Sequence, residues 1–176
     1  IGRLVGEVID FPISPVRLML NALAPVLESE TFYVMKAAVG LSYVISLVML
    51  MGFIAALNLN RWPSERQAFN VWVNLPLFEP SVRDDVVARL KRDALVNIML
   101  GMFLPFIVPV VMRFATDSFD PNDIMTPQPL IWMVTLWAFL PASIVMRGVA
   151  MMRVAAMIHD LRRQRALAAM REWQPS

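Results

Sequence analysis

The sequence predicts an all-α integral membrane protein with three transmembrane helices. Three uncharged runs carry this prediction: 24 residues at 37–60, 19 residues at 94–112 and 23 residues at 124–146. Because about 20 predominantly apolar residues in a helix cross the hydrocarbon core of a bilayer, each run is long enough. The apolar content of 58% in a chain of 176 residues also exceeds the ~45–50% typical of soluble domains.

The N-terminal segment, residues 1–36, is expected to lie on the membrane surface. Ser14 can cap a short helix that has Pro15 at its first position. This helix is too short to span and carries Arg17, so an interfacial amphipathic helix is predicted, with a loosely ordered tail or a re-entrant segment as alternatives. The chain begins with Ile1, and an upstream segment or a fourth span before it stays open.

The first predicted span, residues 37–57, carries small residues at nearly regular helical spacing. Such residues let a neighbouring helix approach closely, so this face is predicted to pack against another helix. Its members are Ala38, Ser42, Ser46, Gly52 and Ala56.

The connection at 58–93 is predicted to form a loop with two short amphipathic helices. Ser64 with Gln67, and Ser81 with Asp84, have the spacing of capping boxes, a hydroxyl followed three residues later by an amide or a carboxylate. The two helices are expected to lie on the membrane, and packing against a partner subunit is an equally physical alternative.

The second predicted span, residues 94–113, contains Pro105 and Pro109. Each proline removes a hydrogen bond from the helix, so the pair is predicted to kink or locally unwind it. A short acidic loop without lysine or arginine follows at 114–129.

The third predicted span, residues 130–147, continues into an arginine-rich helical tail at 148–176. Arginine holds phosphate and carboxylate groups bidentately. The tail is therefore a candidate docking element for other membrane-protein subunits or for anionic lipid headgroups. The residues predicted to make these contacts are Arg153, Arg162, Arg163 and Arg165.

The distribution of basic residues predicts the orientation. Residues 58–93 hold six lysines and arginines, the segment from Arg147 onward holds six, and the loop at 114–129 holds none. By the positive-inside rule, the 58–93 loop and the C-terminal tail are cytoplasmic, with a bacterial inner membrane as the expected location.

The uncharged runs contain no Asp, Glu, Lys, Arg or His, which are the groups that proton-coupled pumps use inside the membrane. The chain lacks cysteine, and its only histidine, His159, stands on the polar tail. The 14 methionines are scattered, which favours apolar packing over a copper(I) site. No cofactor, metal site, nucleic-acid contact or enzymatic activity is therefore predicted.

These observations favour a non-catalytic structural or accessory subunit of a larger multi-protein inner-membrane assembly. Secretion, conjugation, respiratory and photosynthetic machines are not distinguished by the sequence. The alternative is a small homo-oligomeric channel or carrier in which the helix with Pro105 and Pro109 lines the path. A lipid-modifying enzyme using His159 is the weakest of the three hypotheses.

Overall fold

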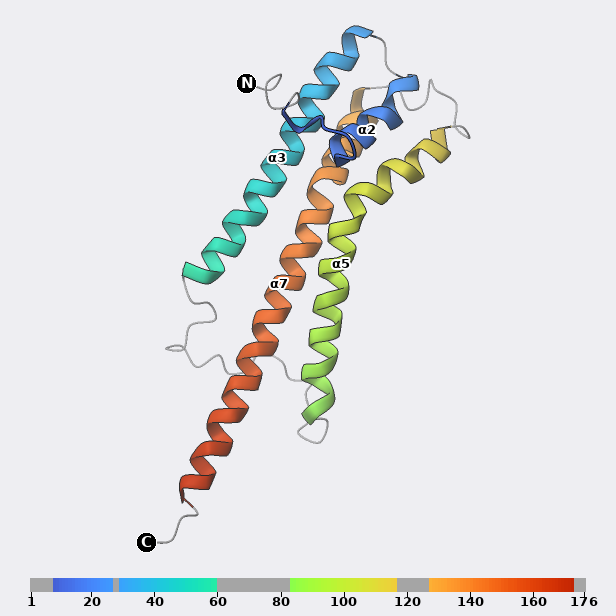
Figure 1. The fold of residues 1–176 in the computed structure, drawn as a ribbon. Helices are drawn as coiled ribbons and strands as arrows, with labels where there is room; N and C mark the ends of the chain where they lie inside the picture. Colours follow the sequence, from blue (N-terminus) through green and yellow to red (C-terminus); the bar gives the residue numbers. More distant parts are fainter. Residues whose placement is uncertain (1–7, 27–28, 60–82, 117–126, 173–176) are drawn as a thin grey trace. The chain divides into compact units, whose positions relative to one another are not determined.

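The computed structural model describes residues 8–26, 29–59, 83–116 and 127–172, and these residues are almost entirely helical. The elements in chain order are the short helix α2 (Pro15–Leu23), a single 3-10 turn (Ala24–Val26) and three long helices (Figure 1). The long helices are α3 (Ser29–Leu59), α5 (Arg83–Thr116) and α7 (Pro127–Glu172).

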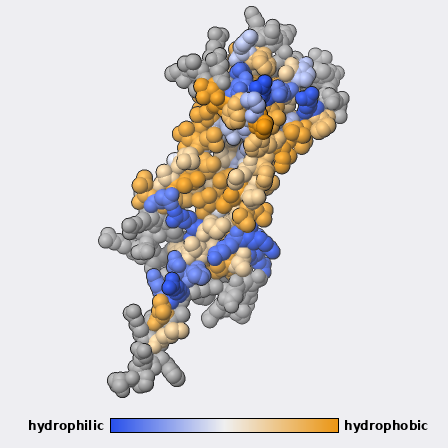
Figure 2. Space-filling view, viewed as in Figure 1, coloured by the Kyte–Doolittle hydropathy of each residue, from blue (hydrophilic) through white to orange (hydrophobic). Residues whose placement is uncertain are grey.

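Each long helix contains a segment that is long and apolar enough to cross a membrane: Thr31–Leu59, Val86–Phe114 and Gln128–Asp160. This confirms the predicted helical fold class with three such helices. In the most apolar window of each segment only 17%, 17% and 39% of the residues are buried. Apolar side chains therefore cover much of the visible surface of these helices (Figure 2), which is uncommon for a soluble monomer and suggests a membrane protein.

The long helices extend beyond the predicted spans. Helix α5 begins at Arg83 and runs without a break into the second span, so the second short helix expected in 58–93 is not a separate element but the first turns of α5. Helix α7 likewise continues past Arg147 to Glu172. The first short helix of that loop, and most of the acidic loop at 114–129, lie outside the described residues.

The chain divides into two compact units, and each takes a part of all three long helices. One unit comprises Ile1–Gly52 with Met99–Val145, and the other comprises Phe53–Ile98 with Met146–Ser176. The principal apolar cluster belongs to the first unit, and the contacts described below each lie within one unit.

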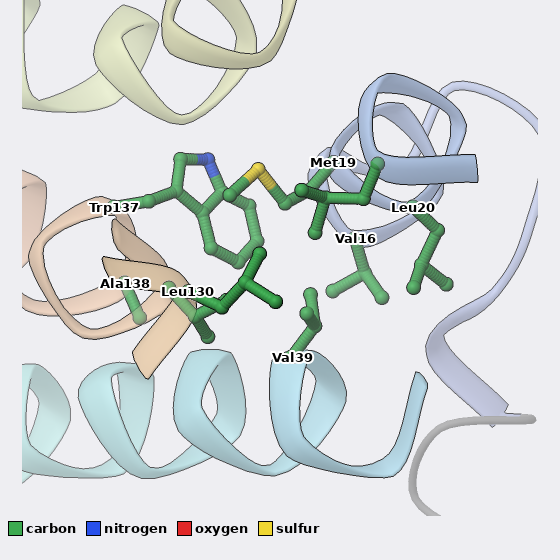
Figure 3. Packing of buried hydrophobic residues seen from close by; sticks show 9 residues of the cluster. Val16, Met19, Leu20, Val39, Leu130, Trp137 and Ala138 are labelled. Atoms are coloured by element: carbon green, nitrogen blue, oxygen red, sulfur yellow. The ribbon is translucent and has the colours of Figure 1, made fainter. Parts of the chain in front are cut away.

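Helix α2 contributes its whole apolar face to this cluster. The Ser14 hydroxyl oxygen accepts a hydrogen bond of 3.0 Å from the backbone N–H of Arg17, which confirms the predicted cap. The apolar side chains of α2 are buried against Val39 of α3 and several residues of α7 (Figure 3). The cluster consists of Val16, Met19, Leu20, Leu23, Val39, Leu130, Val134, Trp137 and Ala138. The apolar face of α2 thus meets protein, whereas the sequence had indicated contact with the membrane surface.

The turn before α2 is fixed by a strained residue and by ion pairs. Ile13 has φ 76°, a left-handed conformation that is unusual for a β-branched residue. Beside it, the Asp10 carboxylate contacts Lys36 Nζ of α3 at 2.6 Å and Arg17 Nε of α2 at 3.9 Å. These contacts attach the entry of α2 to the first turns of α3.

Candidate functional site

A hydrogen bond between α7 and α5 compensates for a backbone group that a proline leaves without its usual partner. In an α-helix the carbonyl of Pro105 would accept from the N–H of residue 109, but Pro109 has no N–H. The buried indole of Trp137 donates to that carbonyl at 3.0 Å instead. In a bilayer, where water is absent, a neighbouring helix has to supply such a donor.

The same indole also contacts α3. Its ring stacks on Tyr43 with the centroids 5.4 Å apart and the planes inclined by 24°. Only 2% of the Trp137 surface is exposed, and Leu130 and Ala138 of the same helix lie close by (Figure 3). One side chain therefore joins α3, α5 and α7 inside the first unit.

The two prolines of α5 face the interior of this unit. Pro105 and Pro109 are both buried, and the helix continues through them without interruption, so the chain is not unwound there. The ribbon of α5 bends in the half that contains them (Figure 1), as expected where a proline ring displaces the preceding turn.

Gly101 allows a close approach of α5 and α7 in the first unit. A Cβ atom built on it would lie 2.7 Å from the Pro141 carbonyl oxygen and 2.5 Å from Cγ2 of Val145. Real Cβ atoms are essentially never that near to backbone, so only glycine fits without a shift of the helices. Backbones that approach this closely gain dispersion contacts, which stabilise helix pairs in membranes.

In the second unit, Gly148 of α7 allows the same close approach to α5. A Cβ atom there would lie 2.8 Å from the carbonyl oxygen of Ala94 in α5 and 2.7 Å from Cγ1 of Ile98. Nearby, Asn97 Nδ2 lies 3.6 Å from the sulfur of Met151, a weak hydrogen bond between the same two helices. The pair α5 and α7 is thus in close contact in each unit, with a glycine from a different helix in each.

The small-residue face predicted on α3 is divided between two environments. Ser46 is buried and donates to the Tyr43 carbonyl at 2.8 Å, and Ser42 is half-buried. Ala38, Gly52 and Ala56 are exposed, and nothing lies within 4 Å of a Cβ atom built on Gly52. Among the residues that the structure describes, this face therefore packs against the chain only at its serines.

Sequence reasoning missed Gly101, Gly148 and the role of Trp137. A signal for the glycines was present, because glycine in a helix interior costs roughly 1 kcal/mol relative to alanine and usually has a packing reason. No comparable signal identified Trp137, since its acceptor lies 32 residues away in sequence.

Hydroxyl and amide groups in the apolar helices bond to the backbone of their own helix. Thr135 donates to the Ile131 carbonyl at 2.7 Å and Ser143 to the Leu140 carbonyl at 2.8 Å. Asn97 donates to the Asp93 carbonyl at 2.9 Å. These polar groups are therefore engaged in the helices that carry them.

The predicted docking arginines do not form one group. Arg153 is half-buried and donates from Nη2 to Oδ1 of Asn58 at the end of α3. Arg163 is exposed, and the side chains of Arg162 and Arg165 lie outside the described part of the chain. His159 is exposed next to Asp160, with 3.7 Å between Nδ1 and Oδ1.

Comparison of the chain with models of protein families, with curated proteins and with solved structures gives no match. The functional argument therefore depends on the contacts described above.

Proposed function

We propose that the chain is a non-catalytic structural or accessory subunit of a larger multi-protein assembly in a bacterial inner membrane, with its C-terminus in the cytoplasm. One observation carries the proposal. Polar side chains in the apolar helices, Ser46, Asn97, Thr135 and Ser143, donate to backbone carbonyls of their own helix, and Trp137 donates to that of α5. The first four groups are satisfied within their own helix and the fifth joins two helices, so all five have structural roles, as expected of a scaffold.

The exposed part of the α3 small-residue face supports the same proposal. Ala38, Gly52 and Ala56 are exposed, and Gly52 has open space around it. A helix of another subunit could come as close to α3 there as α7 comes to α5 at Gly101. A docking role for the α7 tail, with Arg163 exposed on it, remains part of the proposal.

The geometry of α5 favours the alternative, a homo-oligomeric channel, less than it favours a structural subunit. Its path was expected to follow Pro105 and Pro109, but both prolines are buried and the Pro105 carbonyl is bonded to Trp137 of the same chain. For this face to line a path between copies, α7 would first have to leave it.

Site-specific photo-crosslinking combined with purification in mild detergent tests the subunit proposal. A photoreactive residue at Gly52 should form adducts with one or two unrelated membrane proteins that also co-purify in fixed stoichiometry. The matched control is Leu47, which is also exposed but lies about 140° around the helix at 100° per residue. A pure homo-oligomer that conducts ions in planar bilayers would contradict the proposal.

Charge reversal tests the tail separately. Replacing Arg162, Arg163 and Arg165 with glutamate should release a partner while the three long helices keep their helical circular dichroism. If co-purification and protease accessibility both stay unchanged, the tail is not a docking element.

A further inference from the structure

Arg147 stands at a level of α7 where its neighbour α5 is uncharged. The next residue, Gly148, lies against the Ala94 carbonyl and Ile98, and Asn97 contacts Met151. In an antiparallel pair, these contacts place Arg147 close to the level of Asn97. Asn97 lies three residues, or about 5 Å, inside the uncharged run of α5, which begins at Ala94.

The side chain of Arg147 faces away from both neighbouring helices. At about 100° per residue, it lies about 100° around α7 from Gly148, which faces α5, and about 120° from Arg153, which reaches Asn58 of α3. Arg147 is accordingly exposed. Among the described residues, no hydrogen bond or ion pair of its guanidinium is found.

The surroundings at this level are apolar. Leu95 and Val96 of α5 are 54% and 58% exposed, so outward-facing side chains there are hydrocarbon. A charged group near the hydrocarbon edge of a bilayer is costly unless its long side chain reaches the interface and finds a partner there. None of the described residues supplies such a partner for Arg147.

We propose that Arg147 binds the phosphate of an anionic phospholipid at the interface near this end of α5. A guanidinium holds phosphate bidentately, and its aliphatic stem suits an apolar surface. Lys91, exposed on α5 six residues before Asn97, adds positive charge toward the headgroup layer, whereas the charge of Arg92 is offset by Asp93 at 3.7 Å. This inference is independent of the proposed subunit role, because a lipid site would persist in the isolated chain.

The test is a titration of the purified protein with phosphatidylglycerol, followed by native mass spectrometry, with phosphatidylcholine as the neutral comparison. Arg147→Gln should weaken phosphatidylglycerol binding about tenfold or more, the scale of a lost charge-assisted hydrogen bond. Phosphatidylcholine binding should change less. Arg147→Lys keeps the charge without the bidentate geometry and should give an intermediate loss.

Arg17→Gln is the control, because it removes the same charge from an exposed position of α2 in the other unit. General attraction by an exposed charge is weakened by salt screening, so its effect should stay below about twofold. Equal losses in Arg147→Gln and Arg17→Gln would overturn the proposal in favour of diffuse attraction. Unchanged lipid binding would also overturn it, and loss of a co-purifying protein in that case would identify a partner carboxylate as the true ligand.

Discussion

The indole N–H of Trp137 in α7 donates a hydrogen bond of 3.0 Å to the carbonyl oxygen of Pro105 in α5. This acceptor is available because Pro109 cannot donate to it. A proline that would otherwise leave a buried carbonyl unpaired has thereby become a point of attachment between two helices. This hydrogen bond therefore couples the bend of α5 to the position of α7.

Trp137→Phe should lower the free energy of unfolding by about 1–3 kcal/mol, the cost of leaving a buried polar group unpaired, plus the loss of packing from a smaller ring. Pro109→Ala restores a backbone donor for the Pro105 carbonyl, so the same Trp137→Phe change should cost less in that background. Unfolding in mixed micelles, followed by circular dichroism, measures both values. Trp132→Phe, at a residue that is 61% exposed, is the control and should have little effect. Equal costs in the two backgrounds would show that the indole acts through packing alone.

Three of the helix glycines, Gly52, Gly101 and Gly148, should respond in different directions to alanine. Gly101→Ala and Gly148→Ala force atoms into the backbone of the facing helix and should destabilise the fold by about 1–3 kcal/mol each. Gly52→Ala meets open space and removes a poor helix former, so it should be neutral or stabilise by up to about 1 kcal/mol. The same unfolding assay decides, and a loss at Gly52 as large as that at Gly101 would mean that α3 is tightly packed there too.

Ile13→Gly should stabilise the turn before α2. A left-handed conformation costs an L-residue roughly 1–2 kcal/mol, and glycine adopts it freely, although glycine also gains freedom in the unfolded chain. A net gain of about 0.5–1 kcal/mol is therefore expected from the exposed Ile13. Phe11→Gly is the control, because Phe11 is exposed and has no positive φ, and it should not stabilise. A loss at Ile13 would indicate that its side chain makes contacts outside this chain.

The Asp10 and Lys36 ion pair should make a small contribution that depends on salt. Both side chains are about three-quarters covered, and Asp10→Asn should cost about 1 kcal/mol or less. Raising the salt to 1 M should reduce that cost, because the screening length falls to about 3 Å. Asp93→Asn breaks the more exposed contact with Arg92 and should have no measurable effect. A cost at Asp10 that is insensitive to salt would assign its role to hydrogen bonding.

The sequence was sufficient for the features that depend on local composition. Uncharged runs identified the three long apolar helices, and the Ser14–Pro15 pair identified the start of α2. The uncharged runs did not predict where the helices end. They mark the part of a helix that suits the hydrocarbon core, whereas the backbone hydrogen bonds of the helix continue beyond that part. Helix α5 accordingly starts at Arg83, ten residues before Asp93.

Contacts that depend on how helices face one another were not accessible from sequence. Gly52 and Gly101 both lie inside apolar helices, yet one has open space and the other meets backbone. Only the pairing of α5 with α7 distinguishes them. The partner of Trp137 depends on that same pairing, since nothing near position 137 indicates a missing donor at position 109.

The burial of α2 has a consequence for biosynthesis. Its apolar side chains are covered in part by residues from Leu130 to Ala138, which leave the ribosome more than a hundred residues after Leu23. At translation rates of about 5–20 residues per second, the short helix waits roughly 5–20 s for that cover. Docking of α2 can therefore be completed only after Ala138 has been synthesised, and until then its apolar face lacks that cover.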